Sequence, residues 1–411
     1  KVLCYMAHHL GMSMIAVTNL VSGSCIQGYF MQQPEMSAYR SLLEEKVPLS
    51  SAVLPLSESE SEKPRKGESL QWEKRGSDVN FVQPECTVLS NGIYNIMLTE
   101  SGISSSSCAE MLVYRAPFKQ LGGGQGVSLN MLRGNERLSL LPDPTSKVPF
   151  MWEFSEISCT FSCVYDDFTA RSGIAVSGAD NGEVRLVELF AKNNIEDAAI
   201  ELSFEPVLAD ACDYVNHPAY WRLGIEAKTD GNCLMLHRLP RGRQNDAWLC
   251  ISCDKTMTAR AGRIADDGYL SEPFVRAAVN ISLRRGERMS LRFAVCVGST
   301  PEEAYSGVQH MLAIGPAEYG AMVSACAGIT RMSAKDVDGA MQMLSRLRFI
   351  SAAKPFPAKS ALWRYGISGD MPIICCSGDE DVETVTRQFC LIRSCGVYAD
   401  LVFITDEGGE Y

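Results

Sequence analysis

The sequence of 411 residues lacks an excess of positive charge. Its 38 Lys and Arg side chains are outnumbered by 49 Asp and Glu side chains, which gives a formal net charge of -11. Proteins that bind nucleic acid generally present a basic stripe to the phosphates, so this balance argues against nucleic acid as a partner. No apolar run approaches the ~18 residues of a membrane span, and the N-terminus lacks the regions of a signal peptide. We therefore expect a cytoplasmic location.

The spacing of a disulfide framework or a metal site is also absent. The 16 cysteines are scattered, and most lie in apolar runs such as 373–376, which favours buried reduced thiols. Cys250 and Cys253 lack two further zinc ligands at suitable spacing, and residues three apart on a strand point to opposite faces. Cys159 and Cys163 are four apart, so they would share one strand face as buried thiols. We expect no bound metal.

Three other motifs look functional but have a simpler interpretation. The run Gly122–Gly126 lacks the Lys-Ser/Thr and the helix that follow a phosphate loop, so it reads as a flexible hairpin loop. Asp166 and Asp167 would diverge on a strand and make a poor acid/base pair. The run Asp379–Asp381 more simply favours a helix N-terminus. None of these motifs predicts a catalytic residue.

Patterning along the chain predicts five segments. We expect a helical segment over 1–56, a linker over 57–75, strands over 76–299, a helical connector over 300–355, and the start of a truncated α/β unit over 356–411. The fold class is therefore mixed but mainly β, with a large antiparallel sandwich between helical segments. The chain begins at Lys1 and ends just after an apolar run, so we expect a fragment of a longer protein.

The segment boundaries depend on local patterns. Apolar residues alternate over 200–204 and 289–297, as in strands with one buried face, and Arg285–Glu287 predicts a hairpin turn between strands. Thr300–Glu303 has the spacing of a helix-capping box with Pro at the first helical position. Apolar runs at 372–376 and 399–405 flank a helical pattern that ends at Gly396. This order predicts a βαβ unit with a parallel strand pair.

Four stretches along the chain are distinctive: Tyr5–Ser13, Leu42–Pro48, Leu89–Thr99 (LSNGIYNIMLT) and Leu362–Ile373 (LWRYGISGDMPI), with a weaker fifth at Ser203–Leu208 and His217–Tyr220. Taken in this order, they resemble the cyclic β-1,2-glucan synthases and β-1,2-oligoglucan phosphorylases. The first two are similar to the end of a glucoamylase-like helical domain and the segment after it. The third resembles the opening of the supersandwich of glycoside hydrolase family ninety-four, and the fourth resembles the signature after that sandwich.

The resemblance implies a carbohydrate-active parent enzyme whose chemistry lies outside this sequence. The family's catalytic acid lies in an (α/α)₆ barrel, in a G-D-W-N-D-G-like motif that does not occur here. The parent would use inorganic phosphate as a co-substrate if it is a phosphorylase, and no other cofactor is expected. If it is a synthase, upstream domains would place it at the cytoplasmic face of the inner membrane. Relatives carry a Gly-Tyr-Ser loop where this chain has Ser101–Ser107, so the stacking aromatic is missing.

Five residues are candidates for contact with sugar. Trp363, Arg364 and Asp370 lie in the strongest motif and combine an aromatic ring, a fork donor and a carboxylate. The alternative is a structural turn, in which Gly366 and Gly369 need special backbone angles. His8 and His9 either contact sugar or pack within a helix.

Two functions remain open from the sequence. In the first, the fragment belongs to a glycosyltransferase or glycoside phosphorylase acting on β-1,2-glucan and supplies a carbohydrate-binding or scaffolding sandwich without the catalytic acid. In the second, it is a non-catalytic glycan-binding or structural module. Its expected partners are a β-glucan or a glucose-containing oligosaccharide and other domains of the same polypeptide.

Overall fold

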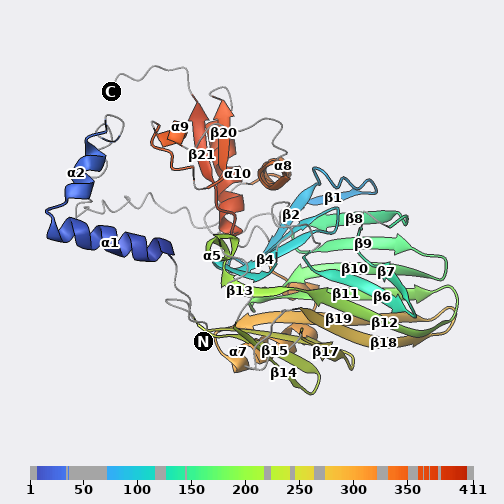
Figure 1. Ribbon diagram of the computed structural model, residues 1–411. Helices are drawn as coiled ribbons and strands as arrows, with labels where there is room; N and C mark the ends of the chain where they lie inside the picture. The colour runs from blue at the N-terminus through green and yellow to red at the C-terminus, as the bar shows by residue number, and fades with distance from the viewer. Residues whose placement is uncertain are drawn as a thin grey trace. The chain divides into compact units, whose positions relative to one another are not determined.

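The computed structural model forms two compact units, residues Lys1–Arg65 and Lys66–Tyr411 (Figure 1). The residues that it describes are 7–33, 36, 72–115, 126–143, 146–216, 224–240, 246–262, 274–321, 332–349, 360–363, 365–369, 371–377 and 381–404.

The first unit contains two described helices, α1 (Ala7–Val21) and α2 (Cys25–Met31). The side-chain oxygen of Asn19 accepts hydrogen bonds from the backbone N–H groups of Ile26 and Gln27, at 3.0 and 3.2 Å, and so satisfies the start of α2. Among the described residues no single helix is long and apolar enough to span a membrane. Residues Leu10–Val21 and Cys25–Met31 meet that criterion only as a pair, with a bend of 100° between them. Residues 37–56 of the helical segment expected over 1–56 lie outside the described residues.

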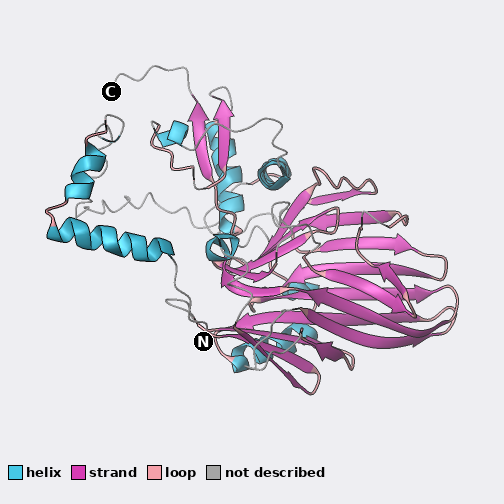
Figure 2. Ribbon diagram, in the orientation of Figure 1, coloured by secondary structure: helices cyan, strands magenta, loops and turns pink. Residues whose placement is uncertain are grey.

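The second unit is mainly β, which confirms the predicted fold class (Figure 2). Its three large sheets are antiparallel. In spatial order, the nine-stranded sheet consists of β1 (Glu73–Gly76), β8 (Phe150–Ser155), β9 (Cys159–Val164), β10 (Phe168–Val176), β11 (Gly182–Ala191), β19 (Arg288–Gly298), β16 (Ala247–Cys253), β15 (Cys233–Arg238) and β14 (Ile225–Asp230). Strand β1 begins within the range predicted as a linker.

Two five-stranded sheets complete the sandwich. The β12 sheet consists of β17 (Thr258–Arg260), β18 (Val275–Leu283), β12 (Ile195–Phe204), β6 (Ser128–Arg133) and β7 (Glu136–Ser139). The β3 sheet consists of β13 (Pro206–Asp210), β5 (Met111–Tyr114), β4 (Ser104–Cys108), β3 (Tyr94–Thr99) and β2 (Cys86–Ser90). Buried side chains from all three sheets form one continuous hydrophobic core.

The alternating patterns over 200–204 and 289–297 do form strands, but both strands are buried on both faces. On β12, Glu201 and Ser203 are only 6% and 2% exposed, although they alternate with the apolar core residues. On β19, the alternate residues Ala294 and Cys296 are buried beneath α7 (Pro301–Ala313). Periodicity identified the strands but not the second layer that covers them.

The turn at Arg285–Glu287 does not make the expected hairpin. The backbone N–H of Glu287 donates to the carbonyl of Arg284 at 3.0 Å, and Gly286 has a φ of 86°, so the chain does reverse here. Strand β18 then pairs in the β12 sheet, whereas β19 pairs between β11 and β16 of the nine-stranded sheet. A turn sequence fixes the reversal, while packing of the following strand decides which layer it joins.

The helix predicted from the capping box is confirmed as α7. The hydroxyl of Thr300 accepts a hydrogen bond from the backbone N–H of Glu303 at 3.2 Å, and Pro301 occupies the first turn. The carboxylate of Glu303 accepts instead from the backbone N–H of Ser299 at 2.8 Å, so the reciprocal bond forms one residue earlier than in a standard box.

The predicted βαβ unit is also confirmed. Strands β20 (Ile373–Ser377) and β21 (Asp400–Ile404) pair in parallel and are joined through α10 (Val382–Ser394). Helix α8 (Ala334–Phe349) packs against both α10 and β2, and buried residues of α8 and α10 belong to the sandwich core. The remaining helices are α5 (Ala211–Asn216), η2 (Pro316–Glu318) and α9 (Ser360–Trp363).

Candidate functional site

Trp363 ends α9 and begins a tight turn. Its indole Nε1 donates to the backbone carbonyl of Ser368 at 3.3 Å, while its side chain remains 50% exposed. Gly366 and Gly369 have φ values of 71° and 72°, which glycine adopts readily. The structural-turn interpretation therefore has direct support, and the exposed ring leaves sugar contact by Trp363 as a prediction.

The other four predicted site residues cannot be assigned contacts. Arg364 and Asp370 lie outside the described residues, on either side of the described turn 365–369. His8 and His9 fall within the bounds of α1, but the structure does not describe their side chains. Their roles in sugar binding stay predictions.

A polar cleft lies at the β7 edge of the β12 sheet. Its volume is about 450 Å³, and we call it the β7 cleft. Strands β6 and β7, the segment after β7 and the turn between β9 and β10 supply its lining, which includes Ser128, Asn130, Arg137, Asp143, Lys147 and Tyr165. Polar side chains therefore converge on it from segments far apart in the sequence.

Arg137 connects the cleft to a buried carboxylate. Its Nη2 atom lies 3.3 Å from Oε1 of Glu201, and the two side chains are 47% and 8% exposed. This contact is an ion pair without hydrogen-bond alignment, because Oε1 of Glu201 makes no hydrogen bond among the described residues. With the Asn130 carbonyl oxygen turned toward Arg137, it accepts from Nε at 3.2 Å and from Nη2 at 2.9 Å. One side of the guanidinium is thus fixed against the sheet.

Tyr165 forms an aromatic wall of the cleft. Its ring stacks on Phe168 with centroids 4.7 Å apart, and its hydroxyl donates to the carbonyl of Ser139 at 2.8 Å. Burial raises the pKa of Tyr165 to about 12, so the hydroxyl stays protonated at neutral pH. The ring is therefore held in one orientation.

Asp167 holds the turn that carries Tyr165. Its carboxylate accepts from Asn193 Nδ2 at 2.9 Å and from Arg133 Nη1 at 2.8 Å. The hydrogen bond from Asn193 has the larger effect and that from Arg133 the next, and both lower the pKa of Asp167, so its carboxylate remains ionised. Asp167 therefore has a positioning role, and the absence of an acid/base pair at Asp166 and Asp167 stays a prediction.

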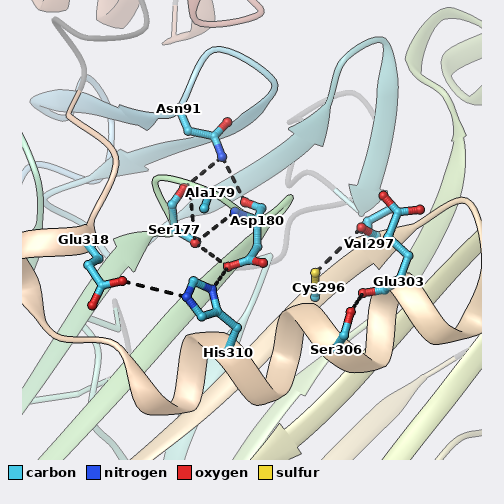
Figure 3. Close-up of polar contacts among 10 residues, drawn as sticks. All are labelled: Asn91, Ser177, Ala179, Asp180, Cys296, Val297, Glu303, Ser306, His310 and Glu318. Carbon is cyan, nitrogen blue, oxygen red and sulfur yellow. Dashed lines mark hydrogen bonds and ion pairs between the residues drawn. The ribbon is translucent and has the colours of Figure 1, made fainter.

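A second polar cluster lies where α7 meets the sandwich (Figure 3). His310 Nδ1 lies 2.7 Å from Asp180 Oδ2, and the same oxygen accepts from the Ser177 hydroxyl at 2.7 Å. Asn91 Nδ2 donates to the carbonyls of Ser177 and Asp180 at 2.8 and 2.9 Å. Both Ser177 and His310 face the Asp180 carboxylate, and among the described residues no imidazole contacts the Ser177 hydroxyl, so the serine–histidine pair of an activated nucleophile is not formed. The cluster joins α7, the β10–β11 turn and the β3 sheet.

The LSNGIYNIMLT stretch has a structural role in this geometry. Asn91 closes the turn between β2 and β3 by accepting from the backbone N–H groups of Ile93 and Tyr94, at 3.0 and 2.8 Å. The Tyr94 hydroxyl donates to Glu183 on β11 at 3.0 Å. The following residues Ser104–Ser107 form strand β4. The expected loop at Ser101–Ser107 is therefore wrong beyond residue 103, because these serines pair with β3.

The paired cysteines behave as the strand geometry predicts. Cys250 packs in the small cluster beneath α7, whereas Cys253 packs in the main core on the other face of β16. Cys159 and Cys163 both belong to the main core, and burial raises the pKa of Cys163 to about 12. The predicted buried thiols are confirmed at these four positions. Asp381 accepts from the backbone N–H of Glu383 and so caps α10, as predicted.

Comparison with known proteins assigns the sandwich to a domain family. Residues 74–273 match the family model of the glycosyl hydrolase 94 supersandwich domain. The chain carries a glycosyl hydrolase 94 supersandwich domain. The supersandwich continues past the matched range in the structure, because β18 and β19 supply interior strands of two sheets.

The chain is also similar, over nearly its whole length, to one much longer protein. It is 23% identical to the cyclic beta-(1,2)-glucan synthase NdvB of Rhizobium meliloti (strain 1021), over 99% of this chain. The chain spans 16% of the length of that relative.

Solved structures resemble the fold more distantly. A protein assigned as a kojibiose phosphorylase, from the human microbiome, aligns with a TM-score of 0.42 at 9% identity, over 67% of this chain and 41% of its own. A bacterial glucoamylase complexed with acarbose aligns with a TM-score of 0.37 at 11% identity, over 67% and 44%.

Sequence reasoning missed the β7 cleft. Asn130, Arg137 and Tyr165 lie in no motif, and they converge only because β6, β7 and the β9–β10 turn meet at one edge. The nearest signal was Glu201, a carboxylate at a polar position of an alternating strand. Alternation assigned Glu201 to solvent, but the supersandwich buries it beside Arg137.

Proposed function

We propose that the chain is part of a carbohydrate-active glycosyltransferase or glycoside phosphorylase that acts on β-1,2-glucan. The supersandwich supplies a carbohydrate-binding or scaffolding surface, and the catalytic acid lies on another part of the polypeptide. The match of residues 74–273 to the glycosyl hydrolase 94 supersandwich carries this proposal. The similarity over 99% of the chain to a cyclic beta-(1,2)-glucan synthase supports the choice of glucan linkage.

The same features define what the chain does by itself. Inverting phosphorolysis needs a carboxylic acid that protonates the glycosidic oxygen while phosphate attacks the opposite face of the sugar. Two carboxylates beside the candidate site are used otherwise, since Glu201 pairs with Arg137 and Asp167 holds a turn. The 411-residue chain therefore binds glucan and does not cleave it.

Two measurements on the purified chain test this function. Calorimetric titration with β-1,2-glucohexaose is expected to show binding, and cellohexaose, the β-1,4 isomer, is expected to bind more weakly. Incubation of the same chain with β-1,2-glucohexaose and inorganic phosphate is expected to release no glucose 1-phosphate. Phosphorolysis by the chain alone would contradict the division of labour, and equal affinity for both isomers would contradict the linkage.

A purely structural module is the second candidate. The junction at Asn91, Asp180 and His310 favours it, because these contacts tie α7, the β10–β11 turn and the β3 sheet together. In that case the supersandwich only positions neighbouring domains, and the titration with β-1,2-glucohexaose gives no heat.

A further inference from the structure

We propose that the β7 cleft is a binding subsite for a neutral gluco-oligosaccharide, contacted by Asn130, Arg137 and Tyr165. The glucan class of the ligand rests on the proposed function. The location rests on the cleft itself, which no family match identifies.

The size and lining of the cleft suit a sugar. Its volume of about 450 Å³ falls within the range of small-molecule sites, roughly 300–1,000 Å³. Serine hydroxyls, an amide, a guanidinium, an ammonium and a carboxylate line it together with the ring of Tyr165. Hydroxyl groups both donate and accept hydrogen bonds, so a polyhydroxyl ligand can use this mixture.

The charges at the cleft favour a neutral ligand. Two cations, Arg137 and Lys147, and one anion, Asp143, line it. The second anion, Glu201, lies 3.3 Å from Arg137 and balances that guanidinium. The formal charges of the four groups cancel, so no unbalanced positive charge remains to select a phosphate or carboxylate ligand.

Arg137 offers hydrogen-bond donors that the protein itself does not use. Its Nε and Nη2 atoms face Asn130, Glu201 and Ser203. Within the part of the chain that the structure describes, no residue accepts from Nη1, and the side chain is 47% exposed. Because Nε and Nη2 are held against the sheet, the planar guanidinium also fixes the position of Nη1. A sugar hydroxyl can therefore accept a hydrogen bond from Nη1 at little cost in side-chain entropy.

Tyr165 supplies a rigid apolar surface beside these donors. The stacked Phe168 ring and the bond to the Ser139 carbonyl fix the ring before any ligand arrives. A preorganised ring and guanidinium reduce the cost of ordering side chains, which is one of the costs that weaken association.

The test compares paired variants of the 411-residue chain in calorimetric titrations with β-1,2-glucohexaose. Arg137→Met is expected to weaken binding about tenfold, as loss of a hydrogen bond from a charged group does. Ser128→Phe fills the cleft and is expected to abolish binding. The control for Arg137→Met is Arg171→Met, which removes an arginine of β10 that pairs with Glu188 of β11. The control for Ser128→Phe is Ser290→Phe, at an exposed position of β19. Both controls are expected to bind as the unaltered chain does.

Each outcome decides something different. If the unaltered chain binds and all four variants bind equally well, the cleft assignment is wrong while the proposed function stands. Equal losses in variants and controls also overturn the assignment. If the unaltered chain gives no heat, the binding function and the subsite both fail. Thermal melting checks the fold of each variant, and Lys147→Met, at an exposed position, decides the question if the strand variants unfold.

Discussion

Glu183 and Arg185, two residues apart on β11, form an ion pair from which water is excluded. Arg185 Nε donates to Glu183 Oε1 at 2.6 Å, and the two side chains are 1% and 0% exposed. Burial is the largest single effect and lowers the pKa of Arg185, but the charge and hydrogen bond of Glu183, together with Tyr114 and Tyr94, outweigh burial and raise that pKa above its ordinary value. The hydroxyls of Tyr94 and Tyr114 complete the cluster, with Arg185 Nη2 donating to Tyr114 at 3.1 Å. The pair therefore links the nine-stranded sheet to the β3 sheet.

Breaking this pair on one side is expected to be costly. Arg185→Met leaves the carboxylate of Glu183 buried without its cation, which typically costs about 3–5 kcal/mol in unfolding free energy. The double variant Glu183→Met with Arg185→Met removes both charges and is expected to recover part of that loss. Urea unfolding measures the difference. The control Arg171→Met breaks an exposed pair with Glu188 and is expected to cost less than about 1 kcal/mol. Equal losses at the two sites would contradict the role of burial.

The amide of Asn91 gives a second prediction. Its nitrogen donates to two backbone carbonyls and its oxygen accepts from two backbone N–H groups. Asn91→Ala loses these bonds and is expected to cost about 2 kcal/mol. Asn91→Asp keeps the acceptor but places a carboxylate oxygen against the carbonyls of Ser177 and Asp180, so it is expected to be worse than alanine. Urea unfolding ranks the two, and a more stable aspartate variant would show that the nitrogen contacts are unimportant.

The sequence was most informative where structure depends on neighbours along the chain. The cap at Thr300, the βαβ unit around α10 and the opposite faces of Cys250 and Cys253 all follow from local geometry, and all were predicted. The resemblance identified the supersandwich from short motifs in order.

Contacts between distant segments could not be predicted in this way. The turn at Gly286 leads β19 into another sheet because the partners of β19, β11 and β16, come from other parts of the chain. Glu201 is buried because Arg137, 64 positions earlier by sequence number, covers it. Alternation of apolar and polar residues along a strand shows which side chains face one packed layer. It does not show whether a second layer of the fold covers the opposite face.

The contact between His310 and Asp180 predicts a pH-dependent contribution to stability. The hydrogen bond to Asp180 and its charge raise the pKa of His310 above its ordinary value. A raised folded-state pKa means that the stabilisation is complete below the unfolded pKa, about 6.5, and is lost as pH rises through the folded pKa. The side chain is 45% exposed, so the effect is expected to be small and to weaken in salt.

The comparison of unaltered chain and His310→Gln isolates this contribution. Their difference in unfolding free energy, measured in urea between pH 5.5 and 8.5, is expected to be largest at the acidic end and to level off at the alkaline end. The control repeats the comparison in an Asp180→Asn background. This change removes the main partner and is expected to remove most of the pH dependence, with Glu318, 3.8 Å from His310 Nε2, accounting for the remainder. A difference that grows with pH would mean that the neutral imidazole is the stabilising form.

Gly307 on α7 provides a case in which the usual effect of alanine in a helix is reversed. Glycine to alanine in a helix interior normally stabilises by up to about 1 kcal/mol. A Cβ atom at Gly307 would clash with the buried Sγ of Cys296, so Gly307→Ala is expected to destabilise the protein by about 1–3 kcal/mol through overpacking. Gly11→Ala on α1, where a Cβ meets open space, is the matched control and is expected to stabilise its helix. Cys296→Ala removes the clashing sulfur and leaves the two Cβ atoms 3.5 Å apart, an ordinary contact. The double variant should therefore regain stability relative to Gly307→Ala, and a failure to do so in thermal melting would place the clash elsewhere along α7.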